Sequence, residues 1–199
     1  MQITHSMLLK LFTSILIGLS LTACTPSLDW RTVRSDDLMY EALYPGKPSR
    51  AEKTIIFNNQ KLTMTMEASR VNDTLFAVGV INIPATAKTI DLKSLKDFLQ
   101  NGMLSNLKTD QAVNPTMISV KTAGQPSYDL PAQEWLLQGL GPDGQQRLLR
   151  FRVVQRNLPD GQIQIYQQSI LQVIKNNAPI EKILRSDEHE MFFTGFKPY

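Results

Sequence analysis

The sequence predicts an α+β fold in which an antiparallel sheet of about six to eight strands is flanked by two main helices. Between residues 30 and 175, turn residues divide most of the chain into short apolar or alternating runs, which is typical of consecutive strands. The apolar period changes to that of a helix only near the middle and at the end of the chain. Strands grouped apart from helices indicate α+β rather than repeated βαβ units.

The first half of the chain supplies four of the expected strands. Pro45 and Gly46 favour a tight turn that stops the first strand. Asn58 and Asn59 join the next two as a hairpin, whose second arm alternates apolar and polar side chains. The fourth is apolar at nearly every position, which is typical of a central strand covered on both faces. The four ranges are residues 38–44, 54–57, 62–68 and 75–83.

The two helices are expected over residues 90–108 and 180–193. The first has a plausible N-cap at Asp91 and carries Phe98 and Leu99 on one apolar stripe. In the second, the acidic residues after position 186 fall in the C-terminal half, where the helix dipole favours cations. We therefore expect that end to fray or to meet a basic group. Between the helices lie four more expected strands, at residues 117–122, 133–138, 146–155 and 163–174.

The start of the chain has the order of a secretory signal peptide. Residues 11–21 form an apolar run directly after Lys10. The run is shorter than the ~20 apolar residues that a helix needs to span a bilayer, so it favours a cleaved leader over a transmembrane anchor. Translation from Met1 and from Met7 both give such a leader, and the sequence leaves the start open.

Residues 21–24 (LTAC) resemble the lipobox of bacterial lipoproteins. The resemblance implies cleavage before Cys24, diacylglycerol on its thiol and usually acylation of the new amino group. Thr25 stands where aspartate would imply retention in the inner membrane, so the expected location is the periplasmic face of the outer membrane, with the lipid at Cys24 as the membrane contact. The chain then divides into a signal peptide (residues 1–23), a lipidated tether (24–29) and a single domain (30–199).

Three short motifs of the domain carry a second resemblance. The opening W-x-x-V…YEALYPGKP, the mid-chain helix between two groups of strands and the closing EMFFTGFK resemble the PsbP-like domains of some bacterial lipoproteins. This resemblance covers most of residues 30–197 and implies an α/β/α sandwich, with an antiparallel sheet between helices. The motifs are structural and none is a catalytic signature, so the resemblance indicates a fold rather than an activity.

The composition limits which covalent links and which kinds of binding partner the domain can have. Cys24 is the one cysteine, so an internal disulfide is excluded. The net charge of +3, which falls by one when Lys10 leaves with the leader, is too small to indicate nucleic-acid binding. With 42% hydrophobic and 20% charged residues, the chain is ordinary globular material.

Two motifs suggest dinucleotide binding and metal binding, but the residues around each motif argue against that chemistry. Gly139, Gly141 and Gly144 match G-x-G-x-x-G, but a strand pattern follows them, whereas dinucleotide binding requires a helix there. His189 stands among acidic residues, but neighbouring helical side chains diverge and no second histidine or free thiol completes a metal site. We therefore expect no metal and no cofactor. Scattered carboxylates leave an envelope hydrolase with a carboxylate pair as the alternative function.

The last long hairpin is the candidate partner-binding site. If the apolar rows of its two strands pair, the arginines of the first strand lie beside polar residues of the second on one face of the sheet. Arg and Tyr are enriched at binding hot spots. The structural alternatives are a solvated outer face, or arginine stems packed under the terminal helix. The candidate residues are Arg150, Arg152, Arg156, Gln164, Tyr166 and Gln168. The function expected from the sequence is a non-catalytic binding or assembly module that contacts an envelope protein.

Overall fold

The computed structural model describes residues 28–87, 90–105, 107–109, 114–175 and 179–199. The signal peptide, the lipobox and most of the tether predicted above lie outside these residues. The helices are α2 (Leu92–Leu104), α3 (Ile180–Leu184) and α4 (Asp187–Thr194). Within the described ranges, no helix is both long enough and apolar enough to cross a membrane.

A large antiparallel sheet organises the fold. Its strand order is β3-β4-β5-β9-β8-β7-β6, and every neighbouring pair is antiparallel. The prediction of an antiparallel sheet of six to eight strands is confirmed, although the chain is mostly β and holds less helix than expected. The strands are β3 (Ser49–Phe57), β4 (Gln60–Val71), β5 (Thr74–Ile83), β6 (Thr116–Lys121), β7 (Asp129–Leu140), β8 (Gln146–Asn157) and β9 (Ile163–Val173).

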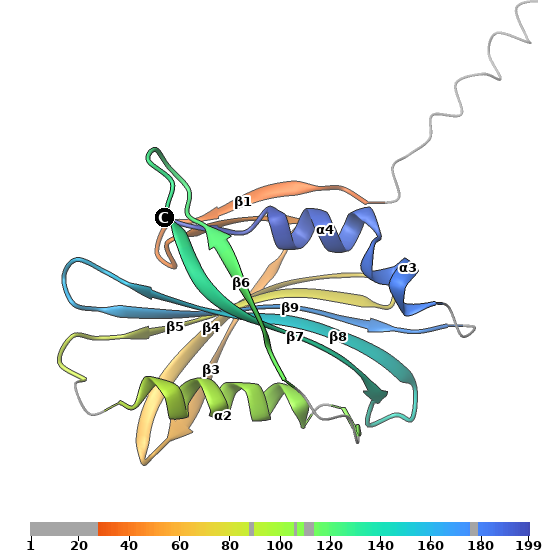
Figure 1. Cartoon of the computed structure of the whole chain (residues 1–199), viewed down its shortest axis with the longest axis horizontal. Helices are drawn as coiled ribbons and strands as arrows, with labels where there is room; N and C mark the ends of the chain where they lie inside the picture. Colours follow the sequence, from red (N-terminus) through yellow and green to blue (C-terminus); the bar gives the residue numbers. More distant parts are fainter. Residues whose placement is uncertain (1–27, 88–89, 106, 110–113, 176–178) are drawn as a thin grey trace, which may run out of the picture.

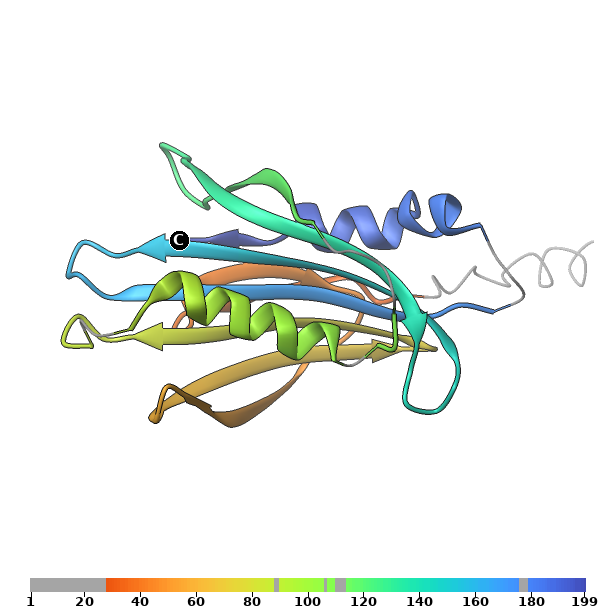
Figure 2. The same ribbon diagram turned by 60° about the horizontal axis from the view of Figure 1, so that its bottom comes forward.

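A smaller sheet has the order β1-β2-β10, with β1 (Arg31–Ser35), β2 (Tyr40–Tyr44) and β10 (Lys197–Pro198). Strand β2 is the end of the run expected at residues 38–44, and it begins after Met39 takes a positive φ of 56°. The sequence did not predict β1 or β10. Helix α2 covers one face of the large sheet, whereas α4 and the small sheet cover the other (Figure 1). Figure 2 shows α2 lying in front of the strands of the large sheet.

Each face of the large sheet has its own apolar core. On the α2 side, Ile81 of β5 packs with Leu95 and Leu99 of the helix. On the other side, Val78 of β5 packs with aromatic residues of β2 and α4. The prediction that residues 75–83 are covered on both faces is confirmed, because this strand supplies buried side chains to both cores.

Helix α2 is shorter than the predicted range of 90–108. The side chain of Asp91 accepts a hydrogen bond from the Lys93 amide at 3.0 Å, so the predicted N-cap is confirmed. Phe98 was expected in the core but is 41% exposed and contacts Phe57 near the rim, with ring centroids 5.6 Å apart.

The expected terminal helix is broken into α3 and α4. Ser186 starts α4 as its N-cap, accepting a hydrogen bond from the His189 amide at 3.5 Å. Asp187, Glu188 and Glu190 therefore lie in the first turn of α4, where the helix dipole favours negative charge. The prediction that these residues oppose the dipole is wrong, because it treated the two helices as one.

The first strand stops before Pro45 as predicted, but Pro45 and Gly46 form a bend without a positive φ at Gly46. Two other predicted turns are present in the structure. Asn58 and Asn59 have φ values of 47° and 62°, the pair of positive values that a two-residue hairpin turn requires. Residues 141–145 form the turn between β7 and β8, in which the Gly141 amide donates to the Gln145 carbonyl at 2.9 Å and Gly144 has a φ of 75°. The G-x-G-x-x-G match is thus part of a strand–turn–strand unit.

Candidate functional site

The six candidate residues on β8 and β9 share one face of the large sheet, as predicted. In the register of the two strands, Arg152 is opposite Gln168 and Arg156 is opposite Gln164. The neighbouring Val154 and Tyr166 belong to the core that includes residues of β2 and α4. The shared face is therefore the one beneath α4 and the small sheet.

The polar residues of β9 are buried on this face. Tyr166 and Gln168 are 0% exposed. The Tyr166 hydroxyl lies 3.0 Å from the Met39 carbonyl oxygen and 2.5 Å from Oε1 of Gln164, and burial raises its pKa to about 12. The Gln168 amide nitrogen donates to the Phe192 carbonyl at 2.7 Å. These side chains attach β9 to β2 and α4.

The arginines of β8 lie against α4. Glu134 of β7 accepts hydrogen bonds from Nε of Arg150 at 3.1 Å and from Nε of Arg152 at 2.5 Å. Both guanidinium groups lie over the Phe193 ring, 4.3 and 4.4 Å from its centroid. Arg150 also donates to Glu190, and Arg152 donates to the Phe193 carbonyl at 3.0 Å. Burial lowers the pKa of Arg152, and the charge of Glu134 opposes that shift.

These contacts close the predicted partner surface. Arg156 completes them, because its guanidinium donates to the carbonyl oxygen of Tyr199. The expectation of an exposed basic face is wrong, since α4 and the C-terminal residues cover it. The alternative, arginine stems packed under the terminal helix, describes the structure.

A buried acid, Glu67, holds the small sheet to the large one. Glu67 of β4 accepts hydrogen bonds from the hydroxyls of Ser35 at 3.0 Å and Tyr40 at 2.5 Å, and its carboxylate lies 3.8 Å from Arg50. Burial raises the pKa of Tyr40 and of Tyr44 above the usual tyrosine range. No local sequence pattern indicates this cluster, because Ser35 and Tyr40 are 32 and 27 positions from Glu67.

One surface hollow is a cleft of about 520 Å³ beside α3 and α4. Its other walls are the turn between β4 and β5, the end of β9 and Leu28. Phe76 contributes apolar surface, and Trp30 packs edge-on against its ring with centroids 6.3 Å apart. The start of the domain is therefore fixed next to the cleft.

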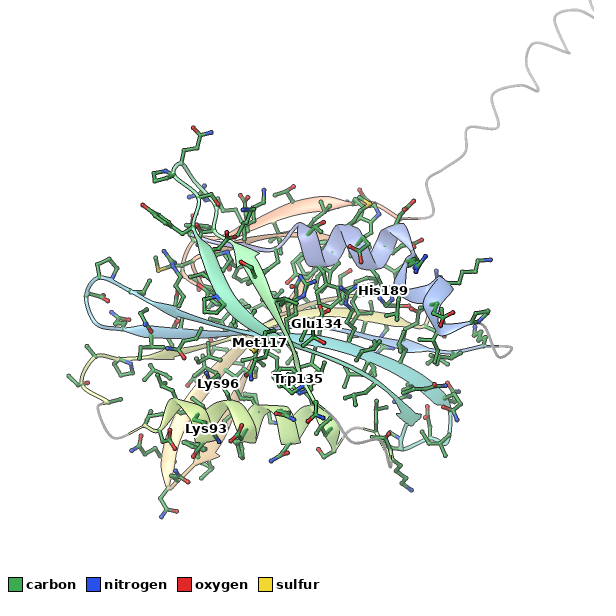
Figure 3. All side chains as sticks on the ribbon, in the orientation of Figure 1. Lys93, Lys96, Met117, Glu134, Trp135 and His189 are labelled. Atoms are coloured by element: carbon green, nitrogen blue, oxygen red, sulfur yellow. The ribbon has the colours of Figure 1, made fainter. Side chains whose placement is uncertain are left out.

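His189 forms part of the cleft wall and is 2% exposed (Figure 3). Its Nε2 lies 2.8 Å from Oε1 of Gln172, and its buried Nδ1 has no hydrogen-bond partner among the described residues. Burial lowers the pKa of His189 to about 4; the charge of Arg150 lowers it further, while Glu188 and Glu190 oppose the shift. The imidazole is therefore neutral at pH 7.

The cleft combines apolar surface with charges of both signs. Asp73 forms an ion pair with Lys175. Lys182 and Glu188 also line the cleft, and neither forms an ion pair with another described residue. Across the described part of the chain, no three His, Cys, Asp or Glu side chains are grouped as a metal site would require. The cleft can bind a small polar or amphipathic group through charge and apolar contact together.

The second hollow is a groove of about 510 Å³ on the opposite, α2 side of the large sheet. It lies between α2 and strands β6, β7 and β8. Glu134 and Trp135 show how β7 serves both sides, because these consecutive residues point to opposite faces (Figure 3). Glu134 lies among the arginines beneath α4, whereas Trp135 stacks on Phe151 on the α2 side, with centroids 4.7 Å apart.

No family model matches the chain, and no curated protein matches it either. Cys24, the predicted lipidation site, lies outside the described residues.

Proposed function

We propose that the chain is a lipoprotein, anchored through diacylglycerol on Cys24 at the periplasmic face of the outer membrane. Its domain is a non-catalytic binding or assembly module of the cell envelope, and the cleft beside α3 and α4 is its binding site. The observation that carries this proposal is the position of Leu28, which lines the cleft only four residues after Cys24. Four extended residues span ~14 Å at most, so the anchor would hold the cleft at the membrane surface.

The proposal includes a PsbP-like domain. The arrangement of layers supports this part of the proposal. Helix α2 covers one face of the antiparallel sheet and α4 with the small sheet covers the other, which is close to the α/β/α arrangement that the sequence resemblance implies. The closing motif also has a structural role in this arrangement, because Phe192, Phe193 and Phe196 are all buried in the core on the α4 side.

The alternative, a hydrolase with a carboxylate pair, is supported by one feature of the cleft. Asp73 and Glu188 both line it. Against a catalytic role, Asp73 is already paired with Lys175. The buried Glu67 and the partly buried Glu134 bind tyrosine and arginine partners. A general acid needs a raised pKa, whereas the aspartates with a displaced pKa are all displaced downward by hydrogen bonds. They are Asp36, Asp37, Asp91 and Asp129.

Photo-cross-linking in the native membrane tests the binding proposal. A photoreactive residue replaces Lys182 at the cleft or, as the control, Ile56 on the far strand β3, where the side chain is 56% exposed. We expect one dominant adduct from position 182 and none from position 56. A matched form that begins at Ser27 behind a cleavable leader, and so lacks the anchor, should lose the adduct.

Two results contradict the proposal. Identical adduct patterns from positions 182 and 56 would remove the cleft as the binding site. An unmodified Cys24 thiol in the mass spectrum of the membrane-derived protein would remove the anchor. Loss of hydrolysis of an envelope substrate in an Asp73→Asn, Glu188→Gln double variant would favour the hydrolase instead.

A further inference from the structure

Strand β6 gives the large sheet an open edge. Among the described strands it pairs only with β7, so the backbone groups on its other side have no strand partner. Figure 1 shows β6 crossing the front of the molecule. Strand β10 of the small sheet lies near β6, and just past the C-terminal end of β6 the Ala123 amide donates to the Pro198 carbonyl at 2.8 Å.

The two edges of the large sheet differ in how they are protected. Strand β3, at the other edge, exposes Arg50, Glu52 and Lys53 along its length, and charges of this kind discourage strand pairing. Strand β6 carries a single charge at its end, Lys121, which is paired with Asp129 at 3.3 Å. Its Met117 is 66% exposed. The edge formed by β6 is therefore available for another strand.

The groove on the α2 side lies directly beside this edge. Met117 of β6 and Lys96 of α2 both line it (Figure 3). Three amide side chains also line it, those of Gln133, Gln155 and Asn157, and the Gln155 amide donates to Asn157 at 3.0 Å. Lys96 is its one charged lining residue, and it forms no ion pair with any other described residue.

We propose that β6 and this groove bind an extended acidic segment of a partner protein by strand addition. The open backbone edge matches another strand at the usual spacing of ~4.8 Å. Alternate side chains of the added strand would then stand on the α2 side of the sheet, beside Met117, which lines the groove. A carboxylate of the added strand would form an ion pair with Lys96. The amide side chains of the groove would form hydrogen bonds with polar groups of the same strand. This site goes beyond the proposed cleft function and depends on neither Cys24 nor His189.

The charges disfavour a second copy of this chain as the occupant. Strand β6 itself (TMISVK) contains no carboxylate to meet Lys96. Strand β3, the other edge, brings two exposed cations with its single acid, Arg50 and Lys53 with Glu52. An acidic partner segment fits the groove better than either strand.

Three synthetic six-residue peptides test the proposal on the full chain, purified from membranes in detergent. One alternates valine with glutamate, one alternates valine with lysine, and one is the acidic peptide with its valines replaced by proline, which cannot join a β-ladder. We expect the first peptide alone to slow amide hydrogen exchange in residues 116–121. Lys96→Glu should lower its affinity about fivefold or more, whereas the matched reversal Lys53→Glu on β3 should leave the affinity unchanged.

The proposal is overturned if the acidic peptide leaves exchange in β6 unchanged, or if the proline peptide binds as well. Equal effects of Lys96→Glu and Lys53→Glu would also overturn it, because attraction to the overall charge would then explain binding. Concentration-dependent association that protects β6 without any peptide would identify a second copy as the occupant. Each of these readings is independent of cross-linking at the cleft, so the two proposals fail separately.

Discussion

Acidification should destabilise the fold through His189. Its pKa falls from 6.5 in the unfolded chain to about 4 in the folded one, because the imidazole is buried and lies near Arg150. Between these values the unfolded state binds more protons than the folded state, so stability falls as the pH falls. The contribution is fully present above pH 6.5 and is lost as the pH approaches 4.

The size of this loss follows from the two pKa values. Taking 6.5 for the unfolded state and about 4 for the folded state, the free energy of unfolding should fall by about 2 kcal/mol between pH 7.5 and pH 5. Most carboxylates stay ionised above pH 5. The window therefore isolates His189, the one histidine of the domain.

Urea unfolding at pH 7.5, 6.5, 5.8 and 5.0 measures the effect, with His189→Gln as the control that cannot titrate. The variant should lack most of the pH dependence, even if it is less stable at pH 7.5. If it does not fold, the pKa of His189 can be measured directly from the imidazole proton shifts of the wild-type protein. A pKa near 6.5, or a wild-type stability that is flat from pH 7.5 to 5, would refute the reasoning.

Three further predictions concern the anchor, the arginines and the terminal helices. Cys24→Ala should leave an uncleaved precursor without lipid, visible by mass spectrometry; normal cleavage would contradict the lipobox. Arg152→Ala should lower the free energy of unfolding in urea by about 2–3 kcal/mol, because Glu134 keeps only Arg150 as its partner. The exposed control Lys93→Ala should change it by no more than ~0.5 kcal/mol, and equal values would show that the arginines are not structural. Truncation after Lys175 should expose the sheet face beneath α4 and cause aggregation, so a truncated chain that stays monodisperse would show that this helix is peripheral.

The strands and their turns were predictable because their signals are local. Asn58-Asn59 and the glycines before β8 determine tight turns through their own backbone preferences. Strand β5 was recognisable because burial on both faces leaves it apolar at almost every position. Strand β10 had no such signal, since two residues form it and β2 supplies its partner backbone.

The break between α3 and α4 was missed, although the sequence contains a sign of it. Ser186 followed by three acidic residues within four positions is a helix start. The apolar residues on either side keep a helical spacing, which favoured one continuous helix. The position of the break determines whether the basic face is exposed. Because α4 starts at Asp187, it lies over the arginines of β8 and covers them.

The partly buried charges beneath α4 fix the position of this helix on the sheet. An apolar face alone would allow α4 to shift along the sheet, whereas the guanidinium groups of Arg150 and Arg152 meet one ring and one carbonyl, both from Phe193. His189 lies one turn earlier on the same helix and forms part of the cleft wall. The arginine contacts therefore hold the cleft wall in position from behind. A substitution at Arg152 should thus disturb the cleft as well as the stability, although its side chain does not line the cleft.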